Sequence, residues 1–174
     1  MKNNQVLRIY LVGFMGTGKT HWGTIWAEKY QLPYIDLDAL IEEKEQLSPQ
    51  QVFEKKGEDY FRKVEAECLR STEVYIKCVV SCGGGAPCFH DNMDWMNQHG
   101  TTVLLQANAV AIFENIKNET GKRPLLKGKN QAELLFFIEQ LSKERKPFYD
   151  QASVKLETKE LTEQSLDIII SSKK

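Results

Sequence analysis

The stretch Gly13-Phe14-Met15-Gly16-Thr17-Gly18-Lys19-Thr20 fits the pattern G-x-x-x-x-G-K-[ST] at every fixed position. Residues 6–12, just before it, are mostly β-branched and apolar, which predicts a short buried strand. Just after it, large apolar and aromatic residues from Trp22 to Tyr30 recur at helical spacing. The pattern therefore lies between a strand and a helix, which is the context that a phosphate-binding loop requires.

A loop of this composition can act as a socket for an anion. Its glycines let the backbone turn sharply and aim N–H groups inward, and the start of the following helix adds partial positive charge. We expect nucleotide phosphates to lie against the backbone of Gly16, Thr17 and Gly18, with Lys19 reaching the β- and γ-phosphates. The hydroxyl of Thr20 is the expected Mg²⁺ ligand. The alternative is a glycine-rich turn that binds nothing.

The composition limits the class of protein. The chain has 174 residues, enough for one domain with a substantial core and too few for two ordinary ones. Its 23 basic and 24 acidic residues nearly balance, so no overall field favours nucleic acid or an anionic membrane. A polar N-terminus and the lack of a long apolar run predict a cytoplasmic protein. The four cysteines show no zinc-type spacing and are expected to be mostly buried thiols.

Residues 32–38 are predicted to form a second strand that ends in acid. In an extended chain Asp36 and Asp38 point to the same side, because side chains alternate with a period of two. Two like charges on one side repel unless a cation or a ligand donor separates them, so the pair favours a Mg²⁺ site. The alternative is an N-cap plus a solvated acid ahead of the helix that begins near Ala39.

Two features in the middle of the chain have both a structural and a functional interpretation. Arg62 and Glu65 share one face of a predicted helix, either as a surface ion pair or as part of a site. Gly83, Gly84 and Gly85 directly follow an apolar strand predicted over residues 78–82. A plain turn rarely needs three consecutive glycines, so a close approach of the backbone to a ligand explains them better.

The C-terminal half contains a long polar segment and two predicted helices. Residues 117–130 are basic and broken by Gly and Pro, which is typical of a solvated connector or of a lid whose arginine closes over a nucleotide. The next helix is expected to stop at Pro147, which leaves Arg145 at a helix end, where contact with the helix dipole is the alternative to a role in a site. A last helix around residues 160–165 is expected to lead into a fifth strand over residues 166–170.

Short apolar strands separated by helical stretches predict an α/β fold, in which a five-stranded parallel sheet is covered by helices on both faces. Ligands bind such sheets at the carboxyl ends of the strands. The phosphate-binding loop, the two aspartates and the three glycines all follow strand ends, so these features converge on one edge.

Taken together, these motifs resemble the shikimate kinase family over nearly the whole chain. The matching segments are Gly-x-Met-Gly-x-Gly-Lys-Thr at 13–20, Asp-x-Asp-x-x-Ile-Glu at 36–42, Phe-Glu-x-x-Gly-Glu-x-x-Phe-Arg-x-x-Glu at 53–65, Gly-Gly-Gly at 83–85, Arg-Pro-Leu-Leu at 123–126 and Arg-x-Pro-x-Tyr at 145–149. The resemblance implies a single P-loop NTPase domain of the nucleoside monophosphate kinase type over residues 1–174, with a substrate-binding segment at about 36–69 and a lid at about 117–130.

The resemblance also implies a reaction. It is the ATP- and Mg²⁺-dependent phosphorylation of the 3-hydroxyl of shikimate, which gives shikimate 3-phosphate and ADP in the pathway to chorismate and the aromatic amino acids. Carried over by position, the implied catalytic residues are Lys19, Asp38 as candidate base, and Arg123 as the lid residue that also contacts the nucleotide. The implied Mg²⁺ ligands are Thr20 and Asp36, and Glu65 is implied to orient Arg62. The residues implied to bind the acceptor are Asp38, Arg62, Gly83, Gly84, Gly85 and Arg145. Adenine is expected between residues near Lys117 and the segment after Tyr149.

The expected partner is the small molecule shikimate, bound by a monomer without nucleic acid or membrane. A rival kinase of the same fold, acting on gluconate or a nucleoside monophosphate, has no reason to carry Arg62, the three glycines and Arg145 together. A GTP-dependent switch protein is a rival from another class, but the chain has neither the Asn-Lys-x-Asp nor the Asp-x-x-Gly motif.

Overall fold

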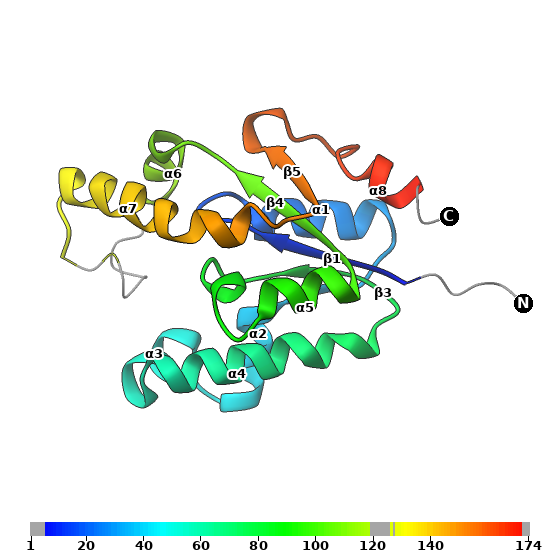
Figure 1. Ribbon diagram of the computed structural model, residues 1–174, viewed down its shortest axis with the longest axis horizontal. Coiled ribbons are helices and arrows are strands. Elements are labelled where there is room, and N and C mark those ends of the chain that lie inside the picture. The colour runs from blue at the N-terminus through cyan, green and yellow to red at the C-terminus, as the bar shows by residue number, and fades with distance from the viewer. Residues whose placement is uncertain (1–5, 119–125, 127, 172–174) are drawn as a thin grey trace, which may run out of the picture.

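A computed structural model of the chain describes residues 6–118, 126 and 128–171. Its centre is a sheet of five parallel strands in the order β2-β3-β1-β4-β5 (Figure 1). The strands are β1 (Leu7–Val12), β2 (Tyr34–Asp36), β3 (Lys77–Ser81), β4 (Thr101–Gln106) and β5 (Val154–Glu157). The predicted α/β class with a parallel sheet is confirmed.

Helices alternate with the strands along the chain. They are α1 (Lys19–Lys29), α2 (Leu37–Glu45), α3 (Pro49–Lys56), α4 (Glu58–Ser71), α5 (Asn92–His99), α6 (Ala109–Ile116), α7 (Gln131–Tyr149) and α8 (Asp167–Ser171). Short 3₁₀ helices are η1 (Thr72–Val74), η2 (Ala86–Cys88) and η4 (Thr158–Glu160).

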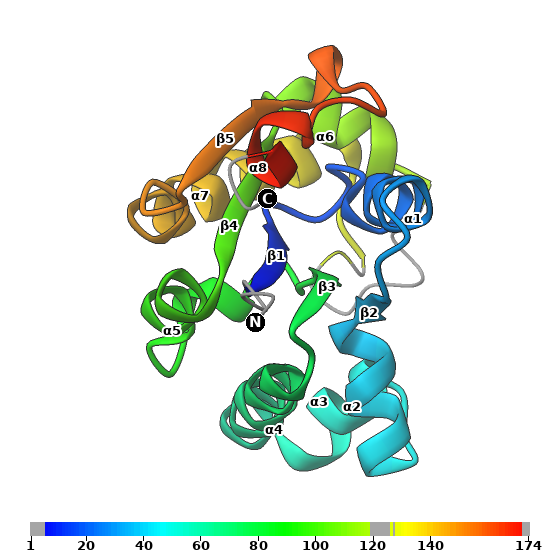
Figure 2. The same cartoon turned by 90° about the vertical axis from the view of Figure 1, so that its right-hand side faces the viewer.

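The helices cover both faces of the sheet, with α1 and α8 on one side and α5 and α7 on the other (Figure 2). The central strand β1 shows why: Ile9 and Leu11 pack in the core cluster that contains α1 and α8, whereas Tyr10 and Val12 pack in the one that contains α4 and α5. All four side chains are fully buried, because alternation sends successive side chains of a two-faced strand into two different cores.

A third apolar cluster supports the phosphate-binding loop from the side. Phe14 packs there with Ile112 and Ile116 of α6 and with Leu134 and Ile138 of α7. The pair α6 and α7 therefore fixes the flank of the loop, close to the carboxyl ends of β1 and β4, whose arrowheads point to the left in Figure 1.

The second strand is shorter than the predicted range 32–38. β2 ends at Asp36, whose side chain accepts a hydrogen bond from the Asp38 N–H at 2.9 Å and caps α2. Asp38 thus lies in the first turn of a helix, and the prediction that one strand aligns the two aspartates is wrong. The physical reason is that a carboxylate at an N-cap satisfies a helix N–H that otherwise has no partner.

The fifth strand is not where the isoleucine-rich run predicts it. Residues 167–171 form α8, in which Ile169 and Ile170 are buried while Ile168 is 85% exposed, so the run is one apolar face of a helix. The fifth strand is instead β5, a half-buried edge strand paired with β4. The helix predicted near residues 160–165 is also wrong, since those residues form turns after η4.

The helical boundaries differ from the predictions at two further points. The sequence predicts a mostly continuous helical pattern over residues 50–76 with a turn at Gly57; the turn is present, with a φ of 86° at Gly57, but α4 ends earlier, at Ser71. Helix α7 continues past Pro147 to Tyr149, so Arg145 lies within the helix and not at its end. Proline there removes one hydrogen bond, but Arg145 and Tyr149 are both buried on the same side one turn apart, and their packing stabilises the last turn.

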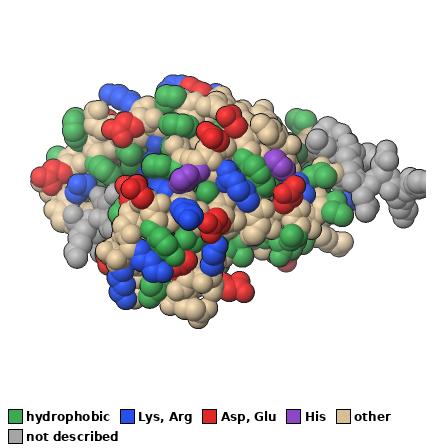
Figure 3. All heavy atoms as spheres, turned by 60° about the horizontal axis from the view of Figure 1, so that its bottom comes forward, with side chains coloured by type: hydrophobic (Ala, Val, Ile, Leu, Met, Phe, Trp, Pro, Cys, Tyr) green, Lys and Arg blue, Asp and Glu red, His purple; other side chains and the backbone are tan. Residues whose placement is uncertain are grey.

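The surface agrees with the balanced composition. On the face in Figure 3, acidic and basic side chains are interspersed and do not gather into one basic patch. Within the described parts of the chain, no helix has the length and apolar character needed to cross a membrane.

Candidate functional site

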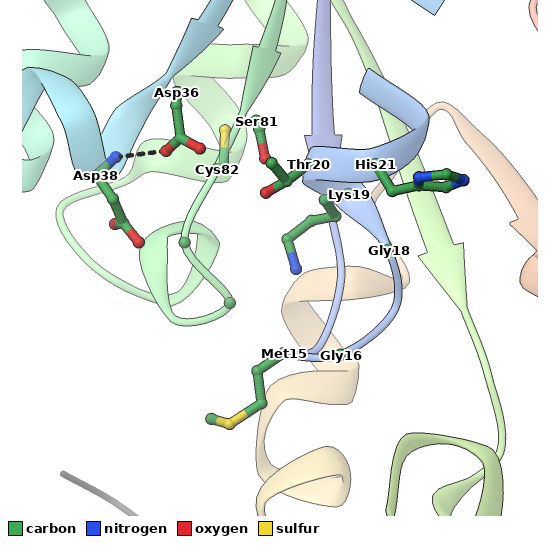
Figure 4. Close-up of a pocket in the computed structure, with 12 residues that line it drawn as sticks. Met15, Gly16, Gly18, Lys19, Thr20, His21, Asp36, Asp38, Ser81 and Cys82 are labelled. Carbon is green, nitrogen blue, oxygen red and sulfur yellow. Dashed lines mark hydrogen bonds between the residues drawn. The ribbon is translucent and has the colours of Figure 1, made fainter. Parts of the chain in front are cut away.

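A cavity of about 310 Å³ opens at the carboxyl edge of the sheet. It is lined by Met15, Gly16, Gly18, Lys19, Thr20, His21, Asp36, Asp38, Ser81, Cys82, Gly83 and Gly84. Figure 4 shows Asp36 and Asp38 on one side of this cavity and Lys19 and Thr20 on the other. The structure thus brings together the phosphate-binding loop, both aspartates and two of the three glycines, as the sequence predicts.

The phosphate-binding loop is shaped by backbone conformations that favour glycine. Gly16 and Gly18 have φ values of 78° and 81°. Lys19 is buried, and its Nζ donates to the carbonyl oxygens of Gly13 and Phe14, each at 2.8 Å. The ammonium group is therefore held inside the curve of the loop, where phosphates are expected.

The acidic wall of the cavity is a helix start. Asp36 closes β2 as the N-cap of α2, and its Oδ2 also accepts a long hydrogen bond from the Tyr34 hydroxyl at 3.4 Å. Asp38, in the first turn of α2, is exposed and faces the cavity. The N-cap interpretation is correct for Asp36, and the same residue also lines the cavity.

The donor set suits a hard cation that also binds phosphates. Among the residues that the structure describes, no group of three or more His, Cys, Asp or Glu side chains could enclose a metal ion. Mg²⁺ usually binds through one or two carboxylates, with phosphate oxygens and water completing its shell. The Thr20 hydroxyl and the Asp36 carboxylate line one cavity and fit that pattern.

Arg62 on α4 is a buried cation surrounded by acids. Its exposed fraction is 7%, its Nη1 donates to Glu65 Oε2 at 2.8 Å, and its Nε and Nη2 each donate to Glu58 Oε1 at 3.3 Å. Glu65 is 1% exposed, so the pair is not a surface ion pair. Burial raises the pKa of Glu65, and the charge of Arg62 opposes that shift.

Arg145 on α7 carries an unsatisfied donor. The side chain is 7% exposed, and its buried Nη1 has no hydrogen-bond partner among the described residues. A buried donor without a partner costs about 1–3 kcal/mol, more if charged, so such a group points to a ligand. Its charge acts on the pKa of Glu65, as does that of Asp38, which places these groups in one electrostatic neighbourhood.

The three glycines connect these groups. A Cβ on Gly83 would lie 3.0 Å from Glu65 Oε1, a Cβ on Gly84 would lie 3.1 Å from Arg145 Nη1, and a Cβ on Gly85 would lie 2.7 Å from Arg62 Nη2. The glycines therefore allow close approach to three ionic side chains, and the plain-turn interpretation does not account for their contacts.

Several residues of the site receive no role from the sequence motifs. Ser81 and Cys82 line the cavity at the end of β3, a position that ligand contacts favour in parallel sheets. Tyr149 donates its hydroxyl to the Gly84 carbonyl oxygen at 2.6 Å, and burial raises the pKa of Tyr149 to about 12, so it stays a donor at neutral pH. His21, for which the sequence suggests no partner, also lines the cavity. Its ring points away from Lys19 in Figure 4.

Part of the predicted site cannot be placed. Arg123 and most of the predicted lid lie outside the described residues, and Lys117 follows α6 and pairs with Glu114 at 2.6 Å. The four cysteines are free thiols, and three of them are buried, as predicted.

The chain matches known proteins over most of its length. The family model for shikimate kinase matches residues 15–173. A shikimate kinase of Bacteroides fragilis is 43% identical over 148 residues, which is 85% of this chain and 83% of that protein. A shikimate kinase of Aquifex aeolicus is 35% identical over 166 residues, 95% of each protein.

Solved structures give the same match. The crystal structure of shikimate kinase from Bacteroides thetaiotaomicron superposes with a TM-score of 0.89 at 38% identity, covering 95% of this chain and 98% of that one. Shikimate kinase from Acinetobacter baumannii in complex with shikimate superposes with a TM-score of 0.86 at 31% identity, covering 97% and 95%. A gluconokinase from Sinorhizobium meliloti, at 18% identity and a TM-score of 0.58, shares the fold alone.

Proposed function

Because the chain belongs to the shikimate kinase family, we propose how its own residues carry out the reaction of that family. The reaction transfers the γ-phosphoryl group of ATP to the 3-hydroxyl of shikimate and leaves shikimate 3-phosphate and ADP, a step toward chorismate and the aromatic amino acids. The role proposed for each residue rests on the geometry of this chain.

The observation that carries the proposal is the contact of Gly84 with both halves of the site. A Cβ at Gly84 would lie 3.1 Å from the unsatisfied Nη1 of Arg145 and 3.2 Å from the Met15 N of the phosphate-binding loop. A pocket of N–H donors suited to a carboxylate and the phosphate-binding loop thus meet at the backbone of Gly84. Shikimate has a carboxylate and neighbouring hydroxyls, so this arrangement suits it better than an uncharged sugar or a nucleotide base.

The carboxylate of shikimate is assigned to Arg62 and Arg145. Planar guanidinium groups bind carboxylates through two parallel hydrogen bonds, which fixes both position and ring orientation. Glu65 orients Arg62 through the 2.8 Å ion pair, and the backbone of Gly83, Gly84 and Gly85 faces the ring hydroxyls.

Asp38 is assigned the role of base toward the acceptor hydroxyl. It faces the cavity opposite Lys19, from the first turn of α2. Phosphoryl transfer spreads charge over the equatorial oxygens, so cationic and N–H donors contribute more than a strong base does. Lys19 and the backbone of Gly16, Thr17 and Gly18 supply these donors on the phosphate side, and Arg123 is assigned the corresponding role from the lid.

Thr20 and Asp36 are the residues that would hold Mg²⁺ with the nucleotide. Bound there, the ion neutralises charge on the β- and γ-phosphates. Adenine is assigned to the space between residues near Lys117 and the segment after Tyr149.

We further propose one kinase domain over residues 1–174, with acceptor contacts from segment 36–69 and a lid at 117–130, acting as a cytoplasmic monomer. The four cysteines are free thiols, which suits a reducing compartment.

A coupled assay for ADP tests the function directly. We expect ADP release to require shikimate, with gluconate and nucleoside monophosphates giving only background rates. Equal turnover of either alternative acceptor would contradict the assignment of the acceptor pocket. Size-exclusion chromatography at assay concentration checks the monomer.

A further inference from the structure

The guanidinium group of Arg62 is packed against an aromatic ring that belongs to none of the family motifs. The centroid of the Phe89 ring lies 4.3 Å from Arg62 Cζ, and that of the neighbouring Phe61 lies 5.1 Å away. Both distances fall within the range of cation–π contact. Phe89 is 36% exposed whereas Arg62 is 7% exposed, so the ring is the outer member of this contact.

Two glutamates and the Gly85 backbone contact other parts of the guanidinium. Glu58 accepts from Nε and Nη2, Glu65 accepts from Nη1, and the Gly85 backbone lies close enough that a Cβ there would be 3.0 Å from Cζ. An arginine has five N–H groups, so one N–H on Nη1 and one on Nη2 remain after these contacts. A ring on the face of the group restrains its orientation without using either of them.

Phe89 is itself held in place by its own segment. The next residue, His90, accepts a hydrogen bond from Arg70 Nη2 through its carbonyl oxygen at 2.7 Å. Asn92 accepts from Arg70 Nη1 at 2.6 Å and donates to the Ala86 carbonyl oxygen at 2.8 Å. The ring is therefore attached to an anchored stretch that begins directly after the three glycines.

We propose that Phe89 is a positioning residue that holds the Arg62 guanidinium in the plane required for the substrate carboxylate and shields that group from water. The inference rests on the assignment of Arg62 to the carboxylate. It predicts that the aromatic face matters, and not merely the bulk of the side chain, because only a π face attracts the cation.

Two substitutions at Phe89 separate these cases. Phe89→Leu keeps an apolar side chain but removes the π face, and we expect the KM for shikimate to rise roughly fivefold. The kcat and the KM for ATP should stay at wild-type values, because the phosphate socket is untouched. Phe89→Tyr keeps the π face and should restore the wild-type KM for shikimate. Tyr75→Leu is the matched control, since Tyr75 is a 40% exposed ring at the opposite end of the sheet and should change neither KM.

A double-mutant cycle with Arg62→Lys tests whether Phe89 acts through Arg62. Lysine lacks the planar group, so adding Phe89→Leu to Arg62→Lys should raise the KM for shikimate less than Phe89→Leu does alone. Equal effects in both backgrounds, a wild-type KM in Phe89→Leu, or a loss confined to kcat would each overturn the inference. If Arg62→Lys itself leaves the KM for shikimate unchanged, the carboxylate assignment fails first, so the two failures are distinguishable.

Discussion

The two halves of the active site are built in opposite ways. On the phosphate side, one continuous stretch from Gly13 to Thr20 supplies the socket, and Lys19 is satisfied by two carbonyl oxygens of the same loop. On the acceptor side, Arg62 of α4 and Arg145 of α7 lie 83 residues apart in the chain, and Arg145 Nη1 has no partner among the described residues. The first half is a local motif, and the second exists only when the fold assembles it.

This difference teaches where specificity lies. The lysine of the phosphate-binding loop is held by carbonyl oxygens of the same loop, and the loop motif itself is common to many nucleotide-binding proteins. A buried guanidinium with an unsatisfied N–H is completed only by an anion of suitable shape. In the proposed arrangement the acceptor half selects the substrate, so substitutions in the two halves should have separable kinetic signatures.

The largest expected effect comes from Asp38, which faces both halves. Asp38→Asn should lower kcat by roughly a thousandfold, because a positioned general base contributes about 10²–10⁴ in rate. ATP affinity, measured by equilibrium titration, should remain near the wild-type value. Full activity in this variant would remove Asp38 from the mechanism.

A second substitution addresses the acceptor half alone. Arg62→Lys should raise the KM for shikimate about 30-fold, since a point charge replaces a planar fork that makes charge-assisted hydrogen bonds. The KM for ATP is the internal control and should not change. An equal rise in both KM values would show that the halves are not separable.

Two glycines give a matched pair of substitutions, one in each half. Gly16→Ala introduces a Cβ at a φ of 78° and 2.5 Å from the Ile116 Cγ2, so it should raise the KM for ATP about tenfold or more. Gly85→Ala places a Cβ 2.7 Å from Arg62 Nη2 and should raise the KM for shikimate by about the same factor. We expect each variant to raise the KM for one substrate and to leave the KM for the other unchanged.

The smallest expected effect concerns the hydrogen bond beneath Gly84. Tyr149→Phe removes the donor to the Gly84 carbonyl oxygen and should lower the free energy of unfolding by about 1 kcal/mol at pH 7. The pKa of Tyr149 is raised from 10.0 to about 12, so this stabilisation is complete below pH 10 and is lost as the pH rises toward 12. Urea unfolding at pH 7 and pH 11 should therefore show the gap between wild type and variant narrowing at the higher pH. A gap that widens with pH would contradict this assignment.

The same contrast explains how much of the fold and site could be predicted from sequence. The phosphate-binding loop and its flanking strand and helix are formed by one continuous stretch of sequence, so the local pattern is sufficient to predict them. The contacts of Arg62 and Arg145 with the glycines depend on how the chain crosses over between strands of the sheet. The periodicity of the sequence does not predict that these residues share one site, and only the family resemblance does.

The errors have a common physical origin in tertiary context. The isoleucine run at residues 168–170 has strand-like composition, but Ile168 is 85% exposed beside two buried neighbours, a pattern that emerges only from docking on the sheet. The real edge strand, Val154–Glu157, mixes apolar and charged residues and gives a weak signal. The hydrogen bond from the Asp38 N–H to Asp36 converted a predicted strand end into a helix start, a local choice that the alternation rule does not include.

The position of Gly84 also limits the room between the two proposed binding regions. A Cβ on Gly84 would lie 3.1 Å from Arg145 Nη1, 3.2 Å from the Met15 N and 3.4 Å from the Gly13 carbonyl oxygen, so α7 and the phosphate-binding loop both approach this one residue. In the proposed arrangement, an acceptor held by Arg145 would therefore lie close to the phosphates, and its hydroxyl oxygen would have only a short way to go to reach the γ-phosphorus. Any larger residue would act as a spacer, and transfer between pre-aligned groups loses rate steeply when the distance between them grows by even about 1 Å.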